Sequence, residues 1–120
     1  MNIFEDKSIL ILAAHFDDVE LAMGGTLNRL TNCKIKYICF TKCDTNSEFP
    51  RINGIKYVSY NLGNKKLPTK RQKILDILDK EKYLFRPDIV FCPSTFDIHQ
   101  DHKTVSEEAI RCFKNFCTIL

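Results

Sequence analysis

The chain has 120 residues, of which 44% are hydrophobic and 28% are charged, and its formal net charge is +3. This length predicts a single domain, and the composition is that of an ordinary globular protein. The mild positive charge gives no reason to expect a nucleic-acid partner, because nucleic-acid-binding domains usually carry a clustered basic face.

Neither a membrane span nor a secretory leader is expected. The longest apolar run, residues 9–14, is far shorter than the roughly 20 residues that a spanning helix needs. Acidic Glu5 and Asp6 stand where a leader would be basic. We therefore expect a cytoplasmic protein with reduced cysteines. None of its six cysteines forms a Cys-x-x-Cys pair, so we expect them to be structural.

The N-terminal half shows a strand, a helix and two further strands. Residues 8–14 form a continuous apolar run, which predicts a strand buried on both faces. A helix is expected over residues 19–31, where leucines provide an inner face. Residues 34–41 and 55–60 are rich in residues that favour strands, and each segment predicts one strand.

The C-terminal half adds two helices and one strand. Thr69 and Gln72 have the spacing of a capping box, which predicts a helix that has Thr69 as its N-cap and ends before Pro87. Residues 88–92 predict a fourth strand. Apolar residues at helical spacing predict the last helix over residues 103–116.

Strands that alternate with helices indicate a parallel sheet covered on both faces. We therefore expect a Rossmann-like three-layer α/β/α domain, whose mainly parallel sheet has the strand order 3-2-1-4-5. In that order the first and fourth strands are neighbours, and ligands bind beyond the carboxyl ends of the strands where the order reverses. Residues 42–54 show no helical pattern, although parallel crossovers usually contain a helix.

Two short stretches contain every histidine of the chain, and each follows one of these neighbouring strands. Residues 15–20 (HFDDVE) follow the first strand, and residues 99–102 (HQDH) follow the fourth. A hydrolytic metal site needs imidazole and carboxylate ligands and a further carboxylate that deprotonates the bound water. The two stretches supply that set, which favours a metal-dependent hydrolase.

Simpler interpretations of each stretch stay open. Asp17 and Asp18 could cap the start of a helix, and His99 and His102 could lie in an exposed loop. The gathering of all the histidines at two adjacent strand ends favours a metal site over both. Residues 97–102 (DIHQDH) also differ by one residue from the metal loop of the metallo-β-lactamase fold, but that fold needs further histidines and none follows His102.

Residues 14–27 (AHFDDVELAMGGTL) resemble the motif A-H-P-D-D-x-E-x-x-x-G-G-T of the PIG-L/LmbE-like N-deacetylases. Residues 87–90 (PDIV) and 99–102 (HQDH) resemble the P-D-x-V strand and the H-x-D-H loop of that family. The resemblance implies a Rossmann-like fold and a zinc-dependent N-deacetylase. Such an enzyme is an amidohydrolase that uses a metal-activated water to remove an acetyl group from an N-acetylglucosamine-type sugar conjugate.

The resemblance also implies a set of metal ligands. Carried over residue by residue, it makes His15, Asp18 and His102 the ligands. Zinc is the expected metal, although ferrous iron also suits two histidines and one carboxylate.

The other site residues follow from the same resemblance. It makes Asp17 the general base, His99 the group that stabilises the transition state, and Asp101 the carboxylate that orients His99. Phe16 replaces the family's proline and is expected to form an aromatic wall against the substrate. Phe96 lies in the loop before His99 and is expected to stack on a sugar ring.

The chain resembles a shortened member of the family. It is expected to form one deacetylase-like domain over residues 1–120, without the usual helix between the second and third strands and without structure beyond residues 118–120. The alternative is a truncated, catalytically weak relative that acts as a binding or partner subunit. A nucleotide-binding Rossmann module is a third interpretation, but no G-x-G-x-x-G follows the first strand.

The expected partner is a small-molecule amino-sugar conjugate. A homo-oligomer is left open, because a second copy could cover an exposed edge of the sheet.

Overall fold

The structure, a computed structural model, describes residues 5–15, 32–42 and 55–120. Within these ranges the sheet has five strands: β1 (Ser8–Ala13), β2 (Lys34–Cys39), β3 (Lys56–Ser59), β4 (Ile89–Phe91) and β5 (Thr118–Ile119). Their order across the sheet is β3-β2-β1-β4-β5, and all the pairings are parallel. The predicted order 3-2-1-4-5 and the Rossmann-like α/β class are confirmed.

The central strand β1 is buried on both faces. Leu10 and Leu12 belong to one apolar cluster, and Ile9 and Ile11 belong to a second cluster. Successive side chains of a strand point to opposite faces of the sheet, so both clusters draw on the same strand. The continuous apolar run of the sequence is therefore the middle of the sheet.

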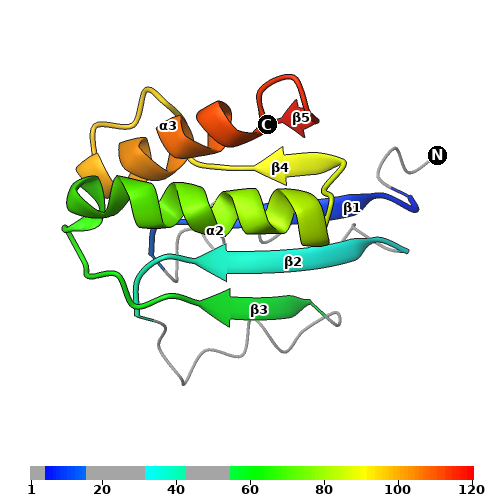
Figure 1. Cartoon of the computed structure of the whole chain (residues 1–120), viewed down its shortest axis with the longest axis horizontal. Helices are drawn as coiled ribbons and strands as arrows, with labels where there is room; N and C mark the ends of the chain where they lie inside the picture. Colours follow the sequence, from blue (N-terminus) through cyan, green and yellow to red (C-terminus); the bar gives the residue numbers. More distant parts are fainter. Residues whose placement is uncertain (1–4, 16–31, 43–54) are drawn as a thin grey trace.

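Among the described residues, helices cover one of these two faces. The helical elements are the 3-10 helix η2 (Leu67–Lys70) and the α-helices α2 (Arg71–Leu84) and α3 (Gln100–Phe113). Figure 1 shows α2 and α3 in front of the sheet. Their buried residues, among them Ile74 and Val105, join the cluster of Leu10. The helix predicted over residues 19–31 lies outside the described residues.

The start of α2 differs from the prediction. Thr69 lies inside η2, and its hydroxyl donates to the carbonyl of Lys66 at 2.6 Å, while Gln72 donates to Asp76. No side chain caps α2. Pro68 suits the first turn of a helix because it lacks an N–H, so the chain turns into η2 before α2 begins. The predicted capping box is therefore wrong.

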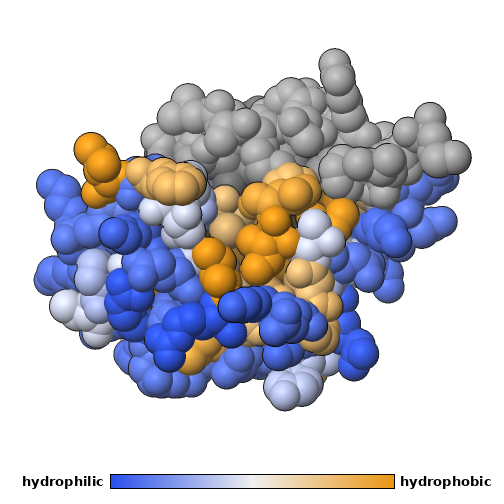
Figure 2. Space-filling model, turned by 90° about the horizontal axis from the view of Figure 1, so that it is seen from above, coloured by the Kyte–Doolittle hydropathy of each residue, from blue (hydrophilic) through white to orange (hydrophobic). Residues whose placement is uncertain are grey.

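Among the described strands, β5 lies at one edge of the sheet and pairs with β4. Figure 2 views the molecule from above. It shows a band of hydrophobic residues between the hydrophilic residues in the lower part of the picture and the grey residues at the top. Across the described part of the chain, large apolar side chains are exposed at Tyr83, Leu84, Phe96, Ile98, Phe116 and Leu120. None of the described helices has the length and apolarity of a membrane span.

Among the described cysteines, Cys92, Cys112 and Cys117 are free thiols. Burial raises the pKa of Cys92 to about 11 and that of Cys112 to about 12. Cys112 also donates a hydrogen bond to Asp79 at 3.3 Å. Since the thiolate is the reactive form, Cys92 and Cys112 are poor nucleophiles at neutral pH.

Candidate functional site

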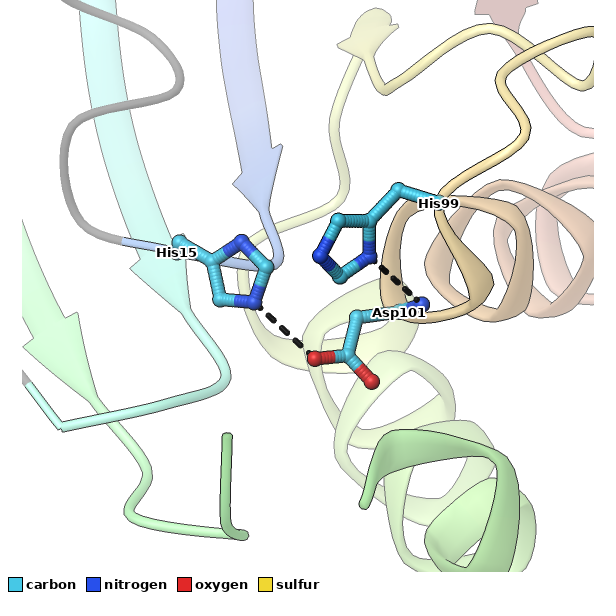
Figure 3. Close-up of side chains that lie close together, drawn as sticks. All are labelled: His15, His99 and Asp101. Carbon is cyan, nitrogen blue, oxygen red and sulfur yellow. Dashed lines mark hydrogen bonds and ion pairs between the residues drawn. The ribbon is translucent and has the colours of Figure 1, made fainter. Parts of the chain in front are cut away.

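The carboxyl edge of the sheet brings two distant parts of the chain together. His15 comes just after β1, and His99 and Asp101 lie at the start of α3, in the segment that follows β4. Figure 3 shows the three side chains close together, and their ligand atoms lie within 4.8 Å of one another. The convergence that the sequence predicts for these two stretches is therefore present for their described residues.

Asp101 forms the floor of the site and is completely buried. Its Oδ2 contacts His15 Nε2 at 2.9 Å and accepts the backbone N–H of Lys65 at 2.6 Å, while its Oδ1 accepts the backbone N–H of Leu67 at 3.2 Å. A carboxylate can only accept, so His15 Nε2 carries a proton. Nδ1 of a neutral His15 therefore keeps its lone pair.

His99 caps α3. Its Nδ1 accepts the backbone N–H of Asp101 at 3.1 Å, and its backbone is extended. This cap places the helix start at Gln100, earlier than the predicted range 103–116. Since Nδ1 accepts, a neutral His99 carries its proton on Nε2. The Asp101 carboxylate was expected to pair with His99. In the structure it contacts His15 instead.

His102 lies within the first turn of α3, with its ring stacked on His99 at 4.7 Å between centroids. Its Nε2 lies 3.3 Å from His15 Nδ1, and its Nδ1 lies 2.8 Å from Asp97 Oδ2. Asp97 Oδ1 also accepts the backbone N–H of His99 at 2.9 Å. The hydrogen bond from the His99 backbone lowers the pKa of Asp97 below its ordinary value, and the hydrogen bond from the His102 side chain lowers it further.

Among the described residues of this cluster, only Asp97 has no role in the sequence motifs. A local signal was present, since an aspartate often accepts the backbone N–H two residues later in an Asx turn. That signal predicts the bond to His99. It does not predict the contact with His102, which depends on the direction in which the loop enters α3.

The donor set fits a small divalent cation. Two nitrogens that bind a tetrahedral zinc ion at 2.0–2.1 Å lie about 3.3 to 3.4 Å apart, and His15 Nδ1 and His102 Nε2 lie 3.3 Å apart. Each of these rings also gives its other nitrogen to a carboxylate, as metal-binding histidines usually do. His15, His99 and Asp101 form an overlapping donor group. Both oxygens of Asp101 already accept hydrogen bonds, which favours the pair of His15 and His102.

The remaining predicted site residues are Phe16, Asp17, Asp18 and Phe96. Phe16, Asp17 and Asp18 lie outside the described residues, so their roles stay predictions. Phe96 is 92% exposed. It is not among the described residues that line the neighbouring cavity, and its contact with a sugar stays a prediction as well.

A cavity of about 590 Å³ opens beside the histidines. Its described lining consists of the site residues His15 and His99 and of polar residues from the ends of β2 and β3 and the loop after β3, namely Thr41, Lys42, Asn61, Asn64 and Lys65. A volume of this size is typical of small-molecule sites. The arrangement can therefore place a polar small molecule against the histidine cluster.

Comparisons with known proteins support this fold at the level of structure. No protein-family model and no curated protein matches the sequence. The conserved protein TT1542 from Thermus thermophilus is 27% identical, with a TM-score of 0.70 over 88% of this chain and 55% of that chain. The N,N'-diacetylchitobiose deacetylase from Pyrococcus horikoshii is 27% identical, with a TM-score of 0.68 over 92% of this chain and 52% of that chain.

A more distant structure shares the fold alone. The A40926 pseudoaglycone deacetylase Dbv21 is 12% identical, with a TM-score of 0.71 over 92% of this chain and 60% of that chain. The chain spans about half the length of the Thermus and Pyrococcus proteins. These likenesses support the LmbE/PIG-L superfamily that the sequence motifs indicate.

Proposed function

We propose that this chain is a zinc-dependent hydrolase that removes the acetyl group from an N-acetylated amino sugar of the N-acetylglucosamine type. The observation that carries this proposal is the convergence of His15, His99, Asp101 and His102 at the carboxyl edge of the sheet. The 27% identical protein from Pyrococcus horikoshii is named as a deacetylase of such a sugar.

The metal would be held by His15 through Nδ1 and by His102 through Nε2. Asp18 is the third ligand that the sequence resemblance implies. A zinc ion held there would lower the pKa of a bound water to about 7 and so supply a nucleophile at neutral pH. Ferrous iron suits the same donors, so the metal itself is part of the proposal.

Asp17 is the proposed general base. It accepts the proton of the attacking water and later returns that proton to the departing amine, which a single carboxylate can do by changing from base to acid. Because Asp17 is adjacent in sequence to the proposed ligand Asp18, both roles rest on the same motif. The Asp17→Asn variant should therefore keep its metal and lose turnover.

His99 is the proposed donor to the amide oxygen. The cap on α3 fixes its ring and uses Nδ1 as an acceptor, so the N–H of Nε2 is available to donate. The amide oxygen gains negative charge in the transition state, and a fixed donor aimed at such an oxygen is typically worth about 10²- to 10³-fold in kcat. His99→Ala should lower kcat by that factor and keep most of the zinc affinity.

The cavity beside the histidines is the proposed sugar site. Lys42 and Lys65 provide ammonium groups, and Asn61 and Asn64 provide amides that both donate and accept. Such groups suit the hydroxyls of a sugar, which also donate and accept. We propose that they select a polar, hydroxylated substrate over an apolar amide.

The test combines metal analysis with an assay of amine release. The purified chain should bind close to one equivalent of zinc, and His15→Ala should lose it. Release of the amine from N,N'-diacetylchitobiose should stop on addition of a chelator and return with zinc. Asp76→Asn, a change at an exposed position of α2, should keep both properties and serves as the control.

Other outcomes would favour the alternatives. Zinc binding without amine release from any N-acetylated sugar would favour a catalytically weak binding or partner subunit. A bound nucleotide with no metal would contradict the hydrolase.

A further inference from the structure

The loop before α3 places a single carboxylate against two histidines. Asp97 Oδ1 accepts the backbone N–H of His99 at 2.9 Å, and Asp97 Oδ2 lies 2.8 Å from His102 Nδ1. The Asp97 side chain is 35% exposed, whereas the Asp101 carboxylate is 0% exposed. Asp97 can therefore be replaced without opening the core, which makes its effect on His102 measurable.

The contact with Asp97 decides where His102 carries its proton. A carboxylate only accepts, so the nitrogen that faces it must donate. A neutral His102 then has its proton on Nδ1 and its lone pair on Nε2, the nitrogen that lies 3.3 Å from His15 Nδ1. Only a nitrogen with a lone pair can bind a metal ion.

We propose that Asp97 is a positioning residue that holds His102 as the Nδ1–H tautomer and so keeps Nε2 ready to bind the metal. The proposal rests on the proposed metal site and adds a residue that the sequence motifs leave out. Carboxylate partners of this kind are typically worth about 10- to 100-fold in metal affinity.

The alternative is that Asp97 only shapes the turn. Its bond to the His99 backbone is an Asx turn, and such a turn needs no carboxylate. Asparagine forms that turn as well as aspartate does, and serine forms it more weakly. If Asp97 were only a turn residue, Asp97→Asn should be harmless and Asp97→Ser should be the worse variant.

The proposal predicts the opposite order. In Asp97→Asn the amide oxygen must accept from the His99 backbone, because a backbone N–H can only donate. The amide NH₂ then faces His102 Nδ1 and donates to it, which moves the ring proton to Nε2. That proton points at His15 Nδ1 and blocks the metal position. In Asp97→Ser the shorter side chain forces neither tautomer.

The first experiment measures the tautomer in the metal-free protein. The ring ¹⁵N chemical shifts of His102, recorded at a pH where the ¹⁵N spectrum shows a neutral ring, should show Nδ1–H in the wild type and Nε2–H in Asp97→Asn. Asp76→Asn, the same chemical change on the exposed face of α2, should leave the wild-type tautomer. An Nδ1–H tautomer in Asp97→Asn would overturn the proposal.

The second experiment measures Zn²⁺ affinity by competition with a chelator. Affinity should fall about 10- to 100-fold in Asp97→Asn and by less in Asp97→Ser. The reverse order would overturn the proposal in favour of the turn alone. A wild type that binds no zinc would contradict the proposed function instead, and the tautomer measurement would still decide the role of Asp97.

Discussion

The floor and the rim of the site contain the same pair of groups in different surroundings. On the floor, His15 contacts the Asp101 carboxylate, which is fully buried and also accepts two backbone N–H groups. On the rim, His102 contacts Asp97, which is 35% exposed. The two contacts are nearly equal in length, at 2.9 Å and 2.8 Å.

The comparison shows that one type of pair can serve two purposes. A buried carboxylate that loses its partners leaves groups without hydrogen bonds away from water, so the floor pair should carry stability. A partly exposed pair can exchange its partners with water, so the rim pair should carry less stability than the floor pair. Its value lies in the orientation of the ring. Substitutions at the two pairs should separate these purposes.

The largest effect is expected from the floor. Asp101→Ala removes the acceptor of His15 Nε2 and of the backbone N–H groups of Lys65 and Leu67. A buried donor that is left without its acceptor typically costs about 1 to 3 kcal/mol in the free energy of unfolding, and Asp101→Ala leaves up to three such donors. Urea unfolding of Asp101→Ala and of the exposed control Asp76→Ala measures it. A loss below about 1 kcal/mol for Asp101→Ala would mean that floor and rim do not differ.

Replacement of His15 should cost more stability than replacement of His102. His15→Ala leaves the buried Asp101 with one hydrogen bond fewer, which should cost about 1 to 3 kcal/mol. His102→Ala leaves only the partly exposed Asp97, which water can reach, and should cost less than about 1 kcal/mol. Both variants should lose zinc, so the unfolding curves are compared without metal. Equal losses of stability would contradict the assignment of the floor as the structural pair.

A change of the rim carboxylate should hardly affect stability. Asp97→Ser keeps a side-chain oxygen for the His99 backbone and removes the contact with His102. We expect a loss of about 0 to 1 kcal/mol in urea unfolding, because exposed pairs contribute little. A loss as large as that of Asp101→Ala would show that the rim is structural too.

The smallest expected effect is on acid stability. The pKa of Asp97 is lowered from its ordinary value of 3.8, so its contribution to stability is complete above that value and is lost as the pH falls through the lowered pKa. A ¹³C NMR titration of the Asp97 carboxyl group in the metal-free protein measures this. A pKa of Asp97 at or above the ordinary value would contradict the two hydrogen bonds at the rim.

Much of the fold could be predicted from the sequence because it depends on short apolar patterns. The run over residues 8–14 predicts a fully buried strand, and β1 (Ser8–Ala13) is that strand, at the centre of the sheet. The alternation of strands and helices then determines a parallel sheet, and the order 3-2-1-4-5 places the ends of β1 and β4 together. The first residues of the helices were harder to predict from the sequence. Pro68 places η2 before α2, and the His99 ring caps α3, which are local contacts that apolar spacing does not contain.

The candidate site divides in the same way. Residue types and their positions after two neighbouring strands were enough to predict that His15, His99, Asp101 and His102 would meet. They were not enough to predict which carboxylate pairs with which histidine, because both Asp97 and Asp101 lie within a few residues of both α3 histidines in sequence. The burial of Asp101 beneath Lys65 and Leu67 directs its carboxylate to His15.

By itself, the sequence determined which residues gather at the carboxyl edge of the sheet, since strand order and chain position decide that. Only the tertiary structure decided which carboxylate faces which ring. That choice depends on how the loop of Asp97 enters α3 and on which backbone N–H groups reach Asp101, and these directions arise only when elements distant in the sequence pack together.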